Sequence, residues 1–140
     1  MTTYHRADVR GRQLFYREAG SKTSPAVVLL HGFPSSSHMF RDLIPQLADK
    51  FHVIAPDYVG FGFSDGQSVH DFEYSFDNLA SHVEELLFEN LGLRHFSIYV
   101  QDYGAPSATG LRQNIRMLFK ALSFRTAMHT WRGLAVPSTR

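Results

Sequence analysis

The chain lacks cysteine altogether, and this absence excludes several kinds of structure and chemistry. Its 140 residues form no disulfide, supply no thiolate to a metal and hold no cysteine nucleophile. Long apolar runs are also missing, because none reaches the roughly 18 residues of a membrane span. The first residues, Met1 to Arg6, lack the apolar stretch of a secretory signal peptide. We therefore expect a cytoplasmic protein that does not bind membranes.

Acidic side chains are unevenly distributed, and the last part of the chain has none. Residues 1–106 hold eight Lys or Arg and thirteen Asp or Glu, a net charge of −5. Residues 107–140 hold six Lys or Arg and no acid, a net charge of +6. This abrupt change sets residues 107–140 apart as an atypical basic tail. Hydrophobic residues make up 44% of the chain, enough for a sizeable core, and we expect no nucleic-acid partner.

Short apolar runs predict strands that are buried inside a sheet. Residues 26–30 are a short, continuous apolar run with β-branched side chains, and residues 51–55 and 96–100 are two further, mostly apolar segments. Runs of this length and composition are typical of parallel strands that are covered on both faces. A further strand is expected at residues 13–18, followed by a turn at Gly20.

Apolar residues at helical spacing predict two helices between these strands. The first begins near Ser35 to Ser37, runs through Leu47 and is kinked by Pro45. The second carries its apolar residues, between positions 79 and 91, on one face and ends at Gly92. Strands that alternate with helices indicate βαβ units with right-handed crossovers. The predicted fold class is therefore α/β, with a mostly parallel sheet.

Two short motifs follow predicted strands, at the sheet edge where open α/β folds build their sites. They are HGFP at residues 31–34 and QDYG at residues 101–104. A nucleophile placed between a strand and a helix sits on a tight turn that needs small neighbours. Asp102 has this place in the chain, and Gly104 supplies a small neighbour on one side. The pattern favours a nucleophile elbow with Asp102 at its tip.

Three phrases together resemble a known family: HGFP at 31–34, APDYVGFGFSD at 55–65 and VQDYGAP at 100–106. In this order and spacing they look like the first half of the α/β-hydrolases that include epoxide hydrolases and haloalkane dehalogenases. The resemblance covers about residues 4–106. It implies the N-terminal part of an α/β-hydrolase sheet flanked by helices, truncated before the cap and the C-terminal half. It also implies a small-molecule substrate, no cofactor and no metal, and it leaves the oligomeric state open.

The resemblance gives each residue of the two motifs a role. Asp102 matches the nucleophilic carboxylate, which attacks an electrophilic carbon and forms an ester intermediate. The backbone N–H groups of Phe33 and Tyr103 match the oxyanion hole, which stabilises the charge that develops when water attacks that ester. The other motif residues shape the two turns: His31, Gly32 and Pro34 in the oxyanion loop, Gln101 and Gly104 in the elbow.

Two positions depart from the pattern of haloalkane dehalogenases. That group usually has Asn where Phe33 stands and Trp where Tyr103 stands, and both side chains donate an N–H to the leaving halide. Phe33 fits an epoxide hydrolase better, although that group also tends to have Trp after the nucleophile. The substrate therefore stays open between an epoxide, a haloalkane and an ester.

Other polar residues have simpler structural interpretations. Asp57 is either a second carboxylate of the site or, as we favour, part of the loop after its strand. The glycine-rich loop at residues 60–66 does not match a dinucleotide-binding motif, and no predicted helix follows it directly. Several histidines are scattered without the spacing of metal ligands: His5, His52, His70, His82 and His95.

The residues that would complete the catalytic cycle are missing from the sequence. Hydrolysis of an Asp ester needs a histidine base and an acid to orient it, and in this family both follow the nucleophile. After Asp102 the chain has no acid, and its only histidine is His129. A complete domain of this kind needs roughly 200–250 residues. We therefore expect residues 1–106 to be a partial α/β-hydrolase domain, alkylated once at Asp102 at most.

The basic tail does not continue the family pattern as written. Four apolar residues between Leu111 and Leu122 lie at helical spacing and predict a helix. Back-translated with chosen codons, the neighbouring reading frame after Pro106 spells IGYRPAAKHPDAIQSLIIQNGNAYVEGL, which resembles the helix and buried strand that follow the elbow in the family. We interpret residues 107–140 as an out-of-frame segment. Without a further strand, the outer edge of the strand at residues 96–100 is expected to be unpaired.

Two other classes of function remain as alternatives. In the first, the chain is a non-catalytic binding or interaction module whose basic tail contacts an acidic partner or a membrane surface. Contacts of that kind weaken in strong salt. In the second, the chain is a redox or nucleotide-binding α/β domain, which the absence of a phosphate-binding loop disfavours.

Overall fold

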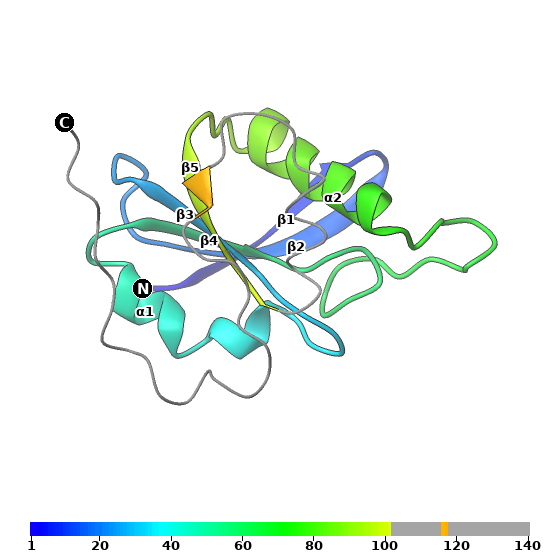
Figure 1. Cartoon of the computed structure of the whole chain (residues 1–140), viewed down its shortest axis with the longest axis horizontal. Coiled ribbons are helices and arrows are strands. Elements are labelled where there is room, and N and C mark those ends of the chain that lie inside the picture. The colour runs from blue at the N-terminus through cyan, green and yellow to red at the C-terminus, as the bar shows by residue number, and fades with distance from the viewer. Residues whose placement is uncertain (102–115, 118–140) are drawn as a thin grey trace.

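One mixed sheet organises the computed structural model, which describes residues 1–101 and 116–117 (Figure 1). Its strands are β1 Thr3–Val9, β2 Arg12–Ala19, β3 Ala26–Leu30, β4 His52–Pro56, β5 Phe96–Val100 and β6 Arg116–Met117. They are hydrogen-bonded in the order β1-β2-β4-β3-β5-β6. In this order, the neighbouring strands β4, β3, β5 and β6 run parallel to one another. Strand β2 is antiparallel to both of its neighbours, β1 and β4. The predicted α/β class and the parallel centre of the sheet are confirmed.

Apolar layers cover both faces of the central strands. Because side chains of a strand alternate between faces, Val28 and Leu30 of β3 belong to the cluster that includes residues of helix α2, Phe76–Glu85. Val27 and Leu29 belong to a second cluster with residues of helix α1, Leu43–Leu47. The two helices lie on opposite sides of the sheet (Figure 1). All residues of β3 and β4 are buried, as their continuous apolar runs predicted.

Of the two strands in the N-terminal hairpin, the sequence predicted only the second. Strand β2 extends the expected segment 13–18 by one residue at each end. The two residues between the strands, Arg10 and Gly11, have φ of 55° and 74°, and positive values at both positions suit a type I′ hairpin turn. Strand β1 was missed because its mostly polar residues lie at the edge of the sheet, where only Val9 is fully covered.

The first predicted helix is divided in two. Ser37–Phe40 form a 3₁₀ turn (η1), and α1 begins at Leu43. In one continuous helix the ring of Pro45 would clash with the carbonyl of Arg41. The chain therefore breaks the helix before Pro45, instead of bending it at Pro45 as the sequence suggested.

The second predicted helix is confirmed over α2. The side chain of Ser75 caps it by accepting a hydrogen bond of 3.3 Å from the N–H of Asn78. At its end the helix widens into a π-helical turn (η2, Leu86–Asn90) that the spacing did not predict. Gly92 follows with φ of 65° and ends the segment, as expected. Within the described residues, no helix has the length and apolar content needed to cross a membrane.

Two expectations about residues 107–140 are contradicted at the outer edge of β5. Arg116 and Met117 form β6, which pairs in parallel with Ser97 and Ile98 of β5. The helix predicted between Leu111 and Leu122 is therefore wrong at these two positions, and the edge of β5 is not left unpaired there. The physical reason is that the backbone groups of a buried strand need partners, and a parallel neighbour supplies them. The rest of residues 107–140 lies outside the described residues.

Candidate active site

The carboxyl ends of β3 and β5 lie side by side at one edge of the sheet. Leu30 and Val100, the last residues of the two strands, are partners in the parallel register. The backbone N–H of Gln101 continues the pairing by donating a hydrogen bond of 3.1 Å to the carbonyl of Leu30. The loop that begins at His31 and the segment that begins at Gln101 therefore leave the sheet from neighbouring points. This is the place where open parallel sheets bind their ligands.

The predicted nucleophile itself is not described. Asp102, Tyr103 and Gly104 follow the half-buried Gln101 in the chain and lie outside the described residues. The structure therefore describes one side of the predicted site, the oxyanion loop, together with the first residue of the elbow.

His31 is a buried anchor of the oxyanion loop. Its ring is fully covered, with the ring centroids of Tyr58 and Phe61 at 4.5 and 5.4 Å. The backbone N–H of Tyr58 donates to Nε2 at 3.3 Å, so Nε2 carries no proton, and Nδ1 donates to the carbonyl of Gly32 at 2.9 Å. These two contacts fix one tautomer. Because both ring nitrogens are engaged and the ring is buried, His31 holds the turn at residues 31–34 in place.

The electrostatic setting keeps the His31 ring neutral. Burial lowers the pKa of His31, and this effect outweighs the hydrogen bond to the Gly32 carbonyl and the charge of Asp57, which both act to raise it. A neutral imidazole suits the two contacts, because one ring nitrogen must accept and the other must donate. The ring therefore adds no positive charge to the edge of the sheet near neutral pH.

The next three residues form a tight turn with one exposed aromatic ring. The N–H of Ser35 donates to the carbonyl of Gly32 at 3.1 Å, and the peptide bond between Phe33 and Pro34 is cis, as in type VI turns. The side chain of Phe33 is 57% exposed, and its ring is nearly perpendicular to that of Phe61, with the ring centroids 6.3 Å apart. Phe33 therefore presents an apolar surface beside the sheet edge.

Asp57 joins the loop after β4 to the loop after β3. It is fully buried, and its carboxylate accepts a short hydrogen bond of 2.6 Å from the N–H of Ser37 and one of 2.9 Å from the N–H of Phe63. Its own carbonyl accepts a hydrogen bond of 2.7 Å from the hydroxyl of Ser64. With both oxygens held by backbone amides, the carboxylate has a loop-building role, which favours the structural interpretation over a second reacting carboxylate.

The sequence analysis did not predict that two charged residues of β2 are buried. Arg17 and Glu18 are each only 6% exposed, although two adjacent charges normally indicate a solvated surface. Their partners are distant in sequence: Arg17 donates to the hydroxyl of Ser37, and Glu18 accepts from His52 at 2.6 Å. No signal in the local sequence marks such pairings. In the described part of the chain, no group of three or more His, Asp or Glu is placed to hold a metal ion.

The sheet and the adjoining strand ends define an α/β protein whose candidate site lies at the carboxyl edge of parallel strands. A profile of the alpha/beta hydrolase fold family matches residues 25–122. This match covers more than half of the chain, so the chain belongs to the α/β-hydrolase family.

Three similar proteins show which members of this family the chain resembles. An uncharacterized hydrolase of Saccharomyces cerevisiae is 46% identical over 104 residues, which cover 74% of this chain and 35% of the yeast protein. A haloalkane dehalogenase of Bradyrhizobium diazoefficiens is 34% identical over 129 residues, which cover 90% of this chain and 40% of that enzyme. The solved structure of the epoxide hydrolase CorEH superposes with a TM-score of 0.74 at 33% identity, covering 82% of this chain and 40% of that one.

The chain is much shorter than the relatives that it matches. The chain spans between a third and two fifths of each of these relatives. The shared part includes the sheet edge described above.

Proposed function

We propose that the complete protein hydrolyses a small organic substrate, an epoxide, a haloalkane or a related ester, through an ester of Asp102. The observation that carries this proposal is the register of β3 and β5, which ends the two strands together at Leu30 and Val100. Because of this register, the chain after Gln101 starts beside the loop of residues 31–34. The similarity to a haloalkane dehalogenase and to an epoxide hydrolase supports the same chemistry.

The reaction has two steps. A carboxylate oxygen of Asp102 attacks the electrophilic carbon, and the C–O bond of an epoxide, the carbon–halogen bond of a haloalkane or the alkyl C–O bond of an ester breaks. The bonding electron pair leaves with the epoxide oxygen, which then takes up a proton, with the halide ion or with the carboxylate of the ester. Water next attacks the carbonyl carbon of the ester, and the N–H groups of Phe33 and Tyr103 stabilise the oxyanion. The alcohol product leaves and the carboxylate of Asp102 is restored.

This chain by itself is proposed to stop after the first step. The second step needs a base to activate water and an acid to orient that base. After Asp102 the sequence offers no acid, and His129 is its only histidine. His31 is not a substitute, because both of its ring nitrogens are engaged in holding the loop. An alkyl ester of Asp102 should therefore accumulate instead of turning over.

The accumulating ester can be detected by intact mass spectrometry. The chain is incubated separately with styrene oxide and with 1-bromobutane, and we expect one adduct per chain with the reagent class that fits the site. The Asp102→Ala variant should lose this adduct. Asp42, whose side chain is 79% exposed, supplies the control, since the Asp42→Ala variant should keep the adduct. Equal labelling of the Asp102→Ala variant would refute the proposed nucleophile.

We also propose that residues 107–140 are encoded out of frame. The proposal rests on the sequence alone: the net charge changes from −5 to +6 at this point. With chosen codons, the neighbouring frame can also be made to spell a family-like segment. Sequencing the encoding DNA decides the matter. Codons after position 106 that spell the alternative segment support the proposal, and codons that cannot spell it end the proposal and leave the basic tail as a genuine part of the protein.

A further inference from the structure

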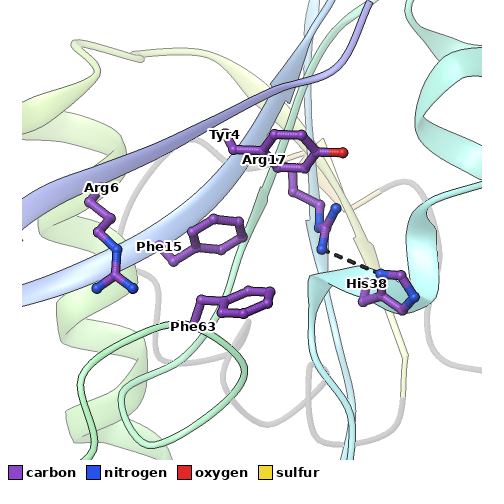
Figure 2. Close-up of a pocket in the computed structure, with 6 residues that line it drawn as sticks. All are labelled: Tyr4, Arg6, Phe15, Arg17, His38 and Phe63. Carbon is purple, nitrogen blue, oxygen red and sulfur yellow. Dashed lines mark hydrogen bonds between the residues drawn. The ribbon is translucent and has the colours of Figure 1, made fainter.

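A hollow lies on the β1–β2 hairpin, and Figure 2 shows the residues that line it. None of them belongs to the motifs at residues 31–34 and 101–104. Its volume is about 410 Å³, which lies within the usual range of small-molecule pockets. The lining combines three aromatic rings, two guanidinium groups and one imidazole. The residues are Tyr4, Arg6, Phe15, Arg17, His38 and Phe63.

The central feature of the hollow is a buried arginine with no acid partner. Arg17 is 6% exposed, and none of the described carboxylates forms an ion pair with it. Its Nε donates to the hydroxyl of Ser37 at 3.0 Å, and Nη2 lies 3.4 Å from Nδ1 of His38. Buried charges are normally paired with an opposite charge. In the described part of the chain, the hydrogen-bond partners of Arg17 are the hydroxyl of Ser37 and the imidazole of His38.

Aromatic rings fix the orientation of this guanidinium. Its central carbon lies 5.0 Å from the ring centroid of Tyr4 and 5.6 Å from that of Phe15. Cation–π contacts of this kind stabilise the charge and hold the plane of the group. The contacts with Ser37 and His38 fix its rotation within that plane. A guanidinium held in advance loses little entropy when it binds a planar anion through two parallel hydrogen bonds.

The remaining lining residues indicate the charge and the shape of a ligand. Arg6 has an acid nearby, with a carboxylate oxygen of Asp65 at 4.0 Å. Among the described residues that line the hollow, Arg17 is the arginine without a carboxylate partner, which suits a ligand with one negative charge. The ring of Phe63 is 58% exposed and lies 5.1 Å from the ring of Phe15, which gives an apolar wall beside the guanidinium. Figure 2 shows the two rings between the two arginines.

We propose that this hollow binds a small aryl carboxylate. The carboxylate of the ligand pairs with the guanidinium of Arg17, and its ring packs on Phe63 and Phe15. Covering these exposed rings adds apolar burial to the charge-assisted hydrogen bonds. The described residues that line the hollow include none to which the proposed reaction at Asp102 assigns a role.

Titration of the full chain with benzoate and with benzamide, followed by ¹H–¹⁵N NMR, tests the proposal. The two probes have nearly the same shape and differ in charge. We expect benzoate to bind with an affinity about ten- to a hundredfold higher than benzamide, as charge-assisted hydrogen bonds give. The shifted signals should include the Arg17 side chain. Equal affinities for the two probes would overturn the proposal.

Two exposed phenylalanines supply a matched pair of variants. Phe63→Ala removes the apolar wall and should weaken benzoate binding about tenfold, without a change in the thermal unfolding midpoint. Phe33 is exposed to the same extent, at 57% against 58%, but does not line the hollow. Phe33→Ala should therefore leave the affinity for benzoate unchanged. The reverse result, with Phe33→Ala weakening binding and Phe63→Ala having no effect, would place benzoate in the strand-end site and contradict the proposal.

Arg17→Gln provides the remaining comparison. It should reduce the affinity for benzoate to that for benzamide, since it removes the charge that distinguishes the two probes. If this variant unfolds, the comparison of benzoate with benzamide and the Phe63→Ala variant still decide the proposal, because neither disturbs the contacts of Arg17 with Ser37 and His38.

Discussion

The backbone N–H of Gln101 donates a hydrogen bond of 3.1 Å to the carbonyl of Leu30. This contact continues the parallel register of β3 and β5 by one residue beyond their ends. It places the start of the elbow segment beside the start of the oxyanion loop. In an open α/β sheet, such adjacency allows a side chain after one strand to act with backbone amides after another. The candidate site follows from how these two strands are aligned.

Gly62 is a position where any side chain should destabilise the loop after β4. Its φ is +54°, and an added Cβ would lie 2.0 Å from a carboxylate oxygen of Asp57. Gly62→Ala should lower the free energy of unfolding by roughly 2–4 kcal/mol, because it strains the backbone and displaces the buried carboxylate. Urea unfolding measures this loss. Gly66 is the matched control: nothing lies within 4 Å of its added Cβ, so Gly66→Ala should change stability by no more than about 0.5 kcal/mol.

Glu18 should make the protein sensitive to acid. Burial acts to raise the pKa of Glu18, but the hydrogen bond from His52 and the charges of Lys22, His52 and His5 outweigh it, so its pKa lies below the ordinary 4.5. A carboxyl with a lowered pKa contributes stability that is present above the unfolded value and is lost as the pH falls through the folded value. Its contribution should therefore be complete at pH 7 and decline below about pH 4.5.

The Glu18→Gln variant tests this contribution. At pH 7 it should be less stable than the original chain by roughly 3 kcal/mol, since it removes a buried carboxylate that accepts a hydrogen bond of 2.6 Å from His52. The difference should shrink when urea unfolding is repeated at pH 3.5. Glu73, which is exposed, provides the control, and Glu73→Gln should be neutral at both pH values. A Glu18→Gln deficit that is the same at both pH values would mean that packing, and not charge, is responsible.

His82 should cause a second loss of stability on acidification, which begins at a higher pH than the loss caused by Glu18. Its ring is 3% exposed, Nδ1 donates to the carbonyl of Asn78 at 2.8 Å, and Nε2 has no partner among the described residues. Burial is the largest cause of its lowered pKa, and the charges of Arg10 and Arg12 act in the same direction. The unfolded chain therefore binds the proton more readily than the folded chain. Stability should fall as the pH drops below the unfolded value of 6.5.

A substitution separates the effect of His82 from that of Glu18. His82→Gln keeps an N–H donor for Asn78 but cannot titrate, so unfolding free energies measured from pH 7 to pH 5 should vary less with pH than in the original chain. His95 is exposed, and His95→Gln should retain the original pH dependence. An unchanged pH dependence in the His82→Gln variant would contradict this interpretation.

The sequence predicted the parts of the fold that depend on local pattern. The continuous apolar runs of β3 and β4 specify strands covered on both faces, and the spacing from Leu79 to Leu87 specifies one buried helix face. The edge strand β1 was missed, because a strand with one exposed face and few apolar residues gives little signal. The π-helical turn at the end of α2 was missed as well, since its cause is not local.

The candidate site could be predicted only where a motif marks it. The motif at residues 31–34 indicated an oxyanion loop, and the structure has a tight turn and the buried His31 there, whereas the role of the loop stays a prediction. Charged residues such as Arg17 and Glu18 were not recognised as buried, because their partners lie 20 and 34 residues away in the sequence. Burial of a charge depends on tertiary contacts that composition and periodicity do not encode.

The most direct test of the proposed chemistry is a crystal structure of the chain after alkylation with the reagent that labels it. The distances to be measured run from the ester carbonyl oxygen of Asp102 to the backbone nitrogens of Phe33 and Tyr103. We expect both to be about 2.7–3.1 Å, the range for donors that stabilise an oxyanion. An Asp102 side chain that points away from the oxyanion loop, with either nitrogen beyond hydrogen-bonding distance, would contradict the proposed mechanism.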